Sequence, residues 1–165
     1  MVPESRLFAV LIFLAAALAL LGALTAQYGF GLLPCHLCLY QRWPYGAVLI
    51  LSAVTFFPAM PRRGRVLLLA LCALAFFGDA GIALYHTGVE QHWWAGPMTC
   101  TGGAPIAGSL DELKDMLAGP VAVVRCDVIA WSLFGISMAG YNIVYASACA
   151  VLAACAAIRL KRGHA

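Results

Sequence analysis

Four apolar stretches dominate the chain and leave little of it for any other structure. They cover residues 7–26, 35–57, 66–86 and 131–158 of 165. Each stretch reaches or exceeds the roughly 20 helical residues that cross about 30 Å of hydrocarbon. With 64% hydrophobic and only 10% charged residues, the chain has too few charges to cover a soluble domain. We therefore predict an all-α integral membrane protein, one domain over residues 1–165, folded as a four-helix transmembrane bundle.

The distribution of Lys and Arg predicts the orientation of this bundle. Seven of the ten basic residues fall at the two termini and in the loop after the second stretch, namely Arg6, Arg62, Arg63, Arg65, Arg159, Lys161 and Arg162. Cytoplasmic loops carry the excess of positive charge. We therefore expect both termini in the cytoplasm and a long outer segment, residues 87–130, on the other side. The net charge of +3 follows from this topology and requires no nucleic-acid partner.

The seven cysteines divide between the outer side and the spans. Four of them lie on the outer side, where disulfides persist: Cys35, Cys38, Cys100 and Cys126. The remaining three fall within the third and fourth spans, where a thiol packs as a small apolar side chain: Cys72, Cys149 and Cys155. The outer set is therefore the candidate for redox chemistry.

Cys35 and Cys38 stand at the outer end of the second stretch, directly after Pro34. Proline suits the first turn of a helix, and an i, i+3 helical pair has Cα atoms about 5 Å apart, within disulfide range. Because a helix N-terminus stabilises a thiolate, we expect this pair to be reactive. Arg42 follows one turn later, where its guanidinium can stabilise a thiolate or a carbonyl oxygen that gains charge.

Two other interpretations of the Cys35/Cys38 pair stay open. The pair can form a purely structural disulfide, or it can supply half of a zinc site. Zinc requires two further ligands, and His36, His86 and His92 are candidates. However, no second cysteine pair has the spacing typical of a zinc finger, so we predict no metal.

Pro44 tests where the second span begins. A helix starting at Pro44 would leave residues 44–57, about 21 Å at 1.5 Å per residue, which is too short to cross a bilayer. We therefore expect the helix to begin near Pro34 and to kink at Pro44.

The outer segment combines an irregular half with a short helix. Glycine and proline recur between residues 96 and 108, as in loops. Ser109 and Glu112 then form a capping-box pattern, and Gly119-Pro120 ends the helix that follows. This short amphipathic helix either lies on the bilayer surface or packs as an ordinary turn on the helix ends.

Four further polar residues lie within or at the edge of the spans. Asp79 is about seven residues inside the third span, and an intramembrane acid is a functional candidate by default. The alternative, which we favour, is an acid hydrogen-bonded to a polar partner such as Asn142. His86, Glu90 and His92 lie at the outer interface, where they can move protons or anchor the helix end.

Taken together, these motifs resemble the DsbB family, the disulfide bond formation proteins of bacterial inner membranes. The resemblance is carried by Pro34-Cys35-His36-Leu37-Cys38-Leu39-Tyr40-Gln41-Arg42, by the pair Cys100/Cys126, and by Arg125-Cys126-Asp127 running into Trp131-Ser132-Leu133-Phe134-Gly135-Ile136-Ser137-Met138. The run Val89-Glu90-Gln91-His92-Trp93-Trp94 resembles the alphaproteobacterial branch. Relatives of vitamin K epoxide reductase also combine four helices with a Cys-x-x-Cys, but there the redox pair follows the loop cysteines.

The resemblance implies a protein-disulfide:quinone oxidoreductase whose redox disulfides are Cys35–Cys38 and Cys100–Cys126. A periplasmic thioredoxin-fold oxidase (DsbA-like) would attack the second disulfide at Cys100, and the freed Cys126 would attack Cys35. Cys38 would then face ubiquinone or menaquinone from the membrane lipid, with Arg42 binding the quinone. The pathway that keeps the bacterial periplasm oxidising has the same order, from DsbA to DsbB to quinone.

Two competing hypotheses remain. The chain can be a non-enzymatic four-span scaffold with structural outer disulfides, although that leaves Arg42 without a purpose. It can also be a reductase that runs the same relay backwards, because the sequence does not set redox potentials.

Overall fold

The computed structural model describes residues 4–57, 59–97, 109 and 124–163. Helix α1 (Glu4–Leu24) continues into a short π-helix, η1 (Thr25–Gly29). Helices α2 (His36–Tyr40), α3 (Arg42–Val54) and α4 (Arg62–Glu90) follow. Strands β1 (Ser132–Leu133) and β2 (Ile136–Ser137) then lead into α6 (Met138–Arg162). The predicted amphipathic helix after Ser109 and the predicted redox residue Cys100 lie outside the described residues.

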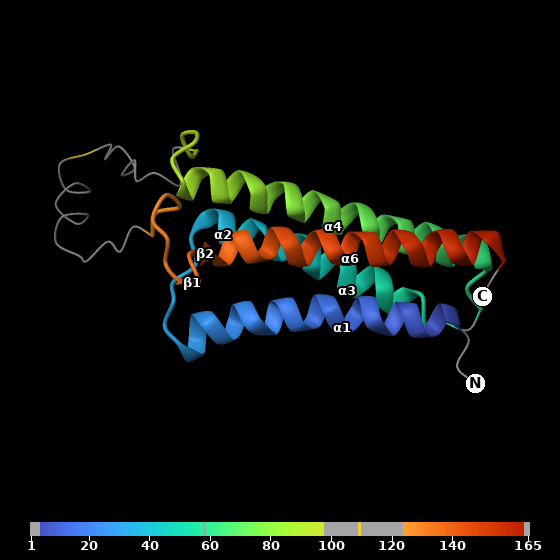
Figure 1. Cartoon of the computed structure of the whole chain (residues 1–165). Helices are drawn as coiled ribbons and strands as arrows, with labels where there is room; N and C mark the ends of the chain where they lie inside the picture. Colours follow the sequence, from blue (N-terminus) through green and yellow to red (C-terminus); the bar gives the residue numbers. More distant parts are fainter. Residues whose placement is uncertain (1–3, 58, 98–108, 110–123, 164–165) are drawn as a thin grey trace.

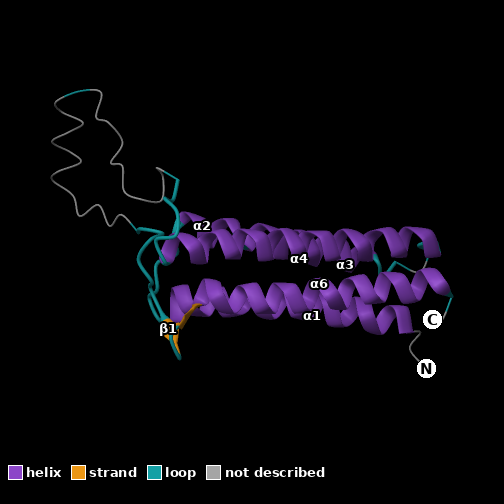
Figure 2. Cartoon of the chain, turned by 45° about the horizontal axis from the view of Figure 1, so that its top comes forward, coloured by secondary structure: helices purple, strands orange, loops and turns teal. Residues whose placement is uncertain are grey.

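The long helices run side by side as a bundle, and both termini lie at the same end (Figures 1 and 2). Helices α4 and α6 pack most extensively, while α1 packs mainly on α3 and only lightly on α6. Small side chains such as Ala16 and Ala153 are fully buried in the core beside Phe76 and Val48. Alanine allows helix backbones to approach closely, which explains the tight α4–α6 contact. The light contact between α1 and α6 leaves room for the cavity described below.

Within the part of the chain that the structure describes, three helices are long and apolar enough to cross a membrane: Arg6–Gly29, Arg62–Glu90 and Met138–Arg162, with 24, 29 and 25 residues. Large apolar side chains point away from the bundle, as lipid-facing side chains do, for example Ile50, Phe77 and Val144, which are 68%, 71% and 69% exposed. The chain is therefore a helical, multi-pass membrane protein. Helix α3 has 13 residues, so the predicted fourth crossing depends on α2 and α3 acting together.

The second predicted span is divided at Gln41. Pro44 lacks the N–H that would bond to the carbonyl of Tyr40, and its ring crowds that carbonyl. Accordingly α2 ends at Tyr40, and α3 begins at Arg42. We predicted a kink at Pro44 itself. The structure instead interrupts the helix one turn earlier, next to the Tyr40 carbonyl that loses its hydrogen bond. The start near Pro34 is also shifted slightly, because Cys35 is the N-cap and His36 the first helical residue.

The fourth predicted span begins later than expected. We predicted a helix from Trp131, but residues 132–137 form a two-stranded hairpin in which Ser132 pairs with Ser137. Its turn residues, Phe134 and Gly135, have φ of 50° and 79°, the left-handed pair that a type I′ turn requires. Ser137 then caps α6 by accepting a hydrogen bond from the Gly140 N–H at 3.1 Å.

Helix α1 together with η1 extends beyond the predicted span 7–26, and α4 extends beyond the predicted span 66–86. At the end of the bundle near the termini, the Arg62 Nε donates to the Leu160 carbonyl at 2.9 Å. This bond joins the start of α4 to the last turn of α6.

Of the three cysteines predicted to pack within spans, Cys72 and Cys149 are buried, whereas Cys155 is exposed on the outside of the bundle. The packing role was therefore predicted correctly for two of them and wrongly for Cys155.

The outer end of α4 is closed by Trp94 folding back over Gly88. The Trp94 Nε1 donates to the Tyr85 carbonyl at 3.0 Å, and the two rings stack with centroids 5.9 Å apart. A Cβ at Gly88 would lie 2.0 Å from the Trp94 ring. The glycine therefore permits this closure.

Replacing Gly88 with alanine is expected to lower the free energy of unfolding by about 1–2 kcal/mol. The added methyl group displaces Trp94 and removes its hydrogen bond and its ring stacking with Tyr85. The measurement is the thermal unfolding midpoint in detergent, together with tryptophan emission. Gly81→Ala is the matched control, because nothing lies within 4 Å of the added Cβ there. Equal midpoints for the two variants would contradict the assigned role of Gly88.

Candidate active site

The Cys35 and Cys38 thiols lie next to each other at the start of α2. Their Sγ atoms are 2.8 Å apart, and both cysteines are free. The Cys38 backbone N–H donates to the Cys35 Sγ at 3.3 Å, so Cys35 caps α2 with its sulfur. A sulfur that accepts from the N-terminal amides of a helix is stabilised as a thiolate. The predicted adjacency is therefore present, with Cys35 at the cap.

His86 reaches the same sulfur from α4. Its Nε2 lies 3.4 Å from the Cys35 Sγ and 3.8 Å from Oε1 of Glu90, one turn further along the helix. The Ser137 hydroxyl, at the start of α6, donates to the other Glu90 oxygen. All three side chains are buried. His86 and Glu90 thus belong to the site, whereas His92 is exposed and has a φ of 59°.

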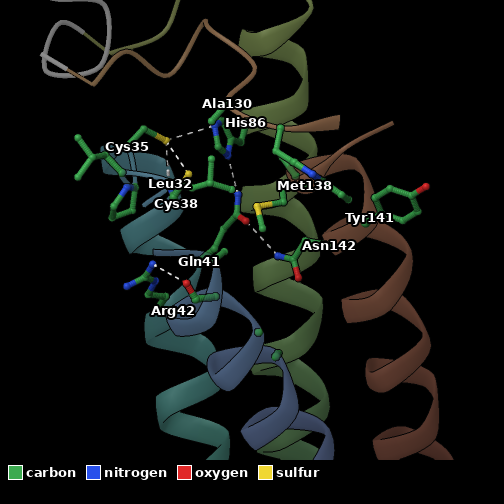
Figure 3. A pocket seen from close by; sticks show the side chains of 18 of the residues that line it. Leu32, Cys35, Cys38, Gln41, Arg42, His86, Ala130, Met138, Tyr141 and Asn142 are labelled. Atoms are coloured by element: carbon green, nitrogen blue, oxygen red, sulfur yellow. Dashed lines mark hydrogen bonds between the residues drawn. The ribbon is translucent and has the colours of Figure 1, made fainter. Parts of the chain in front are cut away.

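A chain of amide hydrogen bonds runs inward from His86 (Figure 3). The Gln41 Nε2 lies 2.9 Å from the His86 Nδ1, and the Gln41 Oε1 accepts from the Asn142 Nδ2 at 3.1 Å. The same Asn142 nitrogen donates to Asp79 at 2.8 Å, and its oxygen accepts from the Tyr45 hydroxyl at 2.5 Å. The favoured prediction for Asp79, a hydrogen bond with Asn142, is therefore confirmed.

Arg42 points toward α1 rather than toward the thiols. Its guanidinium donates to the Gln27 side-chain oxygen at 2.7 Å and to the Ala23 carbonyl at 3.5 Å. The Arg42 Nε is buried and has no hydrogen-bond partner among the described residues. Arg42 therefore holds a fixed position one turn from Cys38 while keeping one buried N–H donor free.

A cavity of about 450 Å³ lies between α1 and α6 and reaches both thiols. Its apolar wall comes from α1 and from the start of α6, and its polar wall comes from residues of the site. The polar lining includes Cys35, Cys38, Gln41, Arg42, His86, Glu90 and Asn142. This volume is in the range of small-molecule and cofactor pockets. The cavity can therefore bring a planar, mostly apolar ligand to Cys38 and Arg42.

Cys126 packs against the same thiols from the outer segment. It is fully buried and disulfide-bonded, and it belongs to one apolar cluster with Cys35, Leu37 and Val89. Its neighbours Arg125 and Asp127 form a two-bond ion pair at 2.9 and 2.5 Å. The Arg125 guanidinium holds the pKa of the Asp127 carboxyl below its usual value. The structure thus brings three of the four predicted cysteines together, and Cys100 lies outside the described residues.

The zinc interpretation has a partial basis in the geometry. The ligand atoms of Cys35, Cys38 and His86 all lie within 4.8 Å of one another. In a tetrahedral site with Zn–S bonds of about 2.3 Å, two thiolate sulfurs stand about 3.8 Å apart. The observed sulfur–sulfur distance of 2.8 Å is shorter than this spacing.

Three residues that make contacts in the site were missed from the sequence. The first is Gln27, the partner of Arg42, and the second is Gln41, which links His86 to Asn142. The signal was present, because Gln41 is an uncharged polar residue inside an apolar stretch, where such residues mark function. Ser137 belongs to a sequence motif that gives no sign of its contact with Glu90.

Comparison with known proteins gives a consistent result. The chain is 34% identical to a Disulfide bond formation protein B of Herminiimonas arsenicoxydans over 102 residues, 61% of this chain and 60% of the relative. It is 29% identical to the protein of that name from Aromatoleum aromaticum over 146 residues, 84% of each. Uncharacterized protein RP370 of Rickettsia prowazekii is 28% identical over 129 residues, 77% of this chain and 73% of the relative.

No solved structure matches the chain. The family model described as Disulfide bond formation protein DsbB matches residues 5–156. This range includes Cys35, Cys38, Arg42, Cys100 and Cys126. The match spans nearly the whole chain, and the chain therefore belongs to the DsbB family of disulfide bond formation proteins.

Proposed function

We propose that this protein is a quinone-dependent thiol oxidase that reoxidises a thioredoxin-fold dithiol oxidase. The observation that carries the proposal is the position of the Cys35/Cys38 pair. The two sulfurs, 2.8 Å apart, line a cavity of about 450 Å³ on one side and contact the cluster of Cys126 on the other. The pair can therefore exchange with a second disulfide and pass electrons to a ligand in the cavity.

The residues of the cavity fit a quinone. Its apolar walls suit a ring and a prenyl tail, and the unpartnered Arg42 Nε is a buried donor for a carbonyl oxygen. A bound ubiquinone or menaquinone would accept two electrons and two protons. Arg42 would bind and orient the ring, while Cys38 would face it from the adjoining wall.

The thiol relay proceeds by successive thiol–disulfide exchanges. The reduced partner attacks the Cys100–Cys126 disulfide, forms a mixed disulfide at Cys100 and releases the Cys126 thiolate. Cys126 then attacks Cys35, and Cys38 leaves as a thiolate. The second thiol of the partner displaces Cys100, so that the partner leaves as a disulfide, and Cys100 attacks Cys126 and releases Cys35. Loss of two electrons to the quinone then forms the Cys35–Cys38 disulfide again. In balance, one dithiol becomes a disulfide and one quinone becomes a quinol.

The proposed location is the inner membrane of a bacterium, with the cysteines facing the periplasm. The support is the excess of Lys and Arg at the termini and at the 58–65 loop, together with the position of both termini at the end opposite the thiols (Figure 1). A reduced DsbA-like protein would then reach Cys100 from the water, and the quinone would enter from the lipid.

The test is a coupled assay of the full chain in detergent. The purified protein is mixed with a reduced DsbA-type protein and a soluble quinone, and quinol and disulfide are both measured. One quinol per disulfide formed, with no turnover when either substrate is omitted, is the expected result. A four-span scaffold would give no quinol at any concentration of partner.

Replacing Cys126 with serine is expected to trap the partner. Cys126→Ser leaves Cys100 as a thiol with no neighbouring cysteine to resolve a mixed disulfide. A partner whose single attacking cysteine is supplied as a mixed disulfide with a small aromatic thiol would therefore exchange with Cys100, release that small thiol and form a covalent adduct, visible as a band on a non-reducing gel. Cys155→Ser, at an exposed free cysteine, is the control and should form no new adduct. Capture by Cys35→Ser alone would place the partner's attack elsewhere.

A further inference from the structure

The hydrogen bonds that run from Asp79 to Cys35 have a direction. The Asn142 Nδ2 donates to Asp79 at 2.8 Å and to the Gln41 Oε1 at 3.1 Å. With its oxygen turned toward Asn142, Gln41 presents its NH₂ group to the His86 Nδ1 at 2.9 Å. An amide NH₂ can only donate. The His86 Nδ1 must therefore accept, and in a neutral ring the proton is on Nε2.

Asp79 is the group that prevents the reverse arrangement. If both amides turned over, the oxygen of Asn142 would face the carboxylate of Asp79, and two acceptors would meet at hydrogen-bond distance. The Tyr45 hydroxyl donates to the Asn142 oxygen at 2.5 Å and supports the same orientation. Asp79 is fully buried, deep in α4, and lies away from the cavity lining. Its carboxylate acts on the site through the amides.

We infer that Asp79, through Asn142 and Gln41, fixes His86 as the Nε2–H tautomer, so that His86 is a hydrogen-bond donor to Cys35 and not its base. Asp79 is in this sense a positioning residue for the sulfur. The inference rests on the proposed function only in treating Cys35 as a reacting thiol.

Two donors then converge on one sulfur. The Cys38 backbone N–H lies 3.3 Å from the Cys35 Sγ, and the His86 Nε2 lies 3.4 Å from it. Both stabilise a Cys35 thiolate. Because the His86 Nδ1 is occupied by Gln41 and its Nε2 already carries a proton, the ring has no free lone pair for the thiol proton. That proton must leave by another group, and the Glu90 carboxylate, whose Oε1 lies 3.8 Å from the His86 Nε2, is the candidate.

The decisive measurement is the ¹⁵N NMR spectrum of His86 in the reduced full-length protein in detergent. The two ring nitrogens of a neutral histidine have different shifts according to which one is protonated, and loss of signal in His86→Gln assigns His86 among the four histidines. We expect a protonated Nε2 and a bare Nδ1. A protonated Nδ1 in the wild-type protein would overturn the inference, whatever the enzymatic activity.

Gln41→Glu and Asp79→Asn test the series of hydrogen bonds from Asp79 to His86. The ionised carboxylate that Gln41→Glu introduces only accepts, so it requires a proton on the His86 Nδ1, whether the ring is neutral or charged. Asp79→Asn permits both amide orientations, and we expect a mixture of tautomers. Gln91→Glu and Asp127→Asn make the same chemical changes at residues that do not take part in these hydrogen bonds. They should leave the spectrum of His86 unchanged. An unaltered wild-type tautomer in both test variants would contradict the role of Asp79 and Gln41.

A thiol measurement separates a donor from a base. Glutamine places an NH₂ group near the position of Nε2 and cannot take up a proton. At neutral pH we expect the alkylation rate of Cys35 to fall about tenfold in His86→Leu and to stay within about threefold of wild type in His86→Gln. Equal losses in both variants would show that His86 acts as a base. This readout needs neither quinone nor partner, so it can fail while thiol oxidase activity survives, and the reverse.

Discussion

Cys38→Ser is expected to reduce quinone turnover by at least about 10³-fold, because serine cannot deliver two electrons or form a disulfide with Cys35. In the proposed relay, the exchange at the Cys100–Cys126 disulfide does not use Cys38, so partner oxidation should still occur once per protein molecule. The measurement is quinol formation in steady state together with the single-turnover yield of oxidised partner. This variant carries the largest effect because it removes the cavity-lining sulfur that, in the proposed relay, delivers electrons to the quinone.

Cys72→Ser is the matched control for Cys38→Ser. It also replaces a thiol by a hydroxyl, at a buried cysteine in the bundle core away from the cavity lining. Its turnover should stay within a few-fold of wild type. If Cys38→Ser turns over quinone as fast as the wild type, electrons do not leave through Cys38 and the proposed relay is wrong.

Arg42→Met is expected to lower kcat/KM for quinone by about 10- to 100-fold, the effect of losing one charge-assisted hydrogen bond to a carbonyl oxygen. Methionine keeps the length and apolar character of the side chain, so the cavity wall is preserved. Because the proposed relay places partner exchange at the other cysteine pair, the rate of mixed-disulfide formation should not change. The two rates are measured separately, by quinol absorbance and by rapid quenching with a thiol reagent.

Two further variants show whether the effect of Arg42→Met comes from the position of the guanidinium or from its charge. Gln27→Leu removes the 2.7 Å partner that holds the guanidinium, and it should raise KM for quinone by a smaller factor while leaving the charge in place. Arg65→Met removes a positive charge near the start of α4, at the end of the bundle opposite the thiols, and should leave both rates unchanged. If Arg42→Met and Arg65→Met lowered kcat/KM for quinone equally, the cause would be the change in net charge and not the loss of a quinone-binding residue.

Much of the bundle was predictable because hydrocarbon thickness sets helix length. The apolar stretches located α1 and α4, apart from their ends. The helix after Cys35 was harder, since hydropathy does not record which carbonyl loses its partner, and the break falls at Gln41 rather than Pro44. The late start of α6 follows from the turn at Phe134 and Gly135 that precedes it. A left-handed conformation is unusual for phenylalanine, so the apolar sequence around Phe134 does not predict a turn there.

Within the candidate site, sequence reasoning found side chains by type but could not find their partners. The proximity of Cys35 and Cys38 followed from helix spacing, and Asp79 with Asn142 followed from the cost of burying a lone acid. The contact of His86 with Cys35 joins residues 51 positions apart, and only the packing of α4 beside α2 creates it. The bond between Arg42 and Gln27 likewise depends on how α1 sits against α3.

The light contact between α1 and α6 has a kinetic consequence. The cavity has α1 and α6 side chains on its two sides, whereas Cys126 approaches the sulfur pair from the outer segment. In the proposed reaction, one substrate is dissolved in water and the other in lipid, and electrons pass from the first to the second only through the relay of cysteines. The two substrates would not compete for a common pocket, so neither should act as a competitive inhibitor of the other. Diluting quinone with additional lipid should then slow the enzyme even when the total amount of quinone is constant.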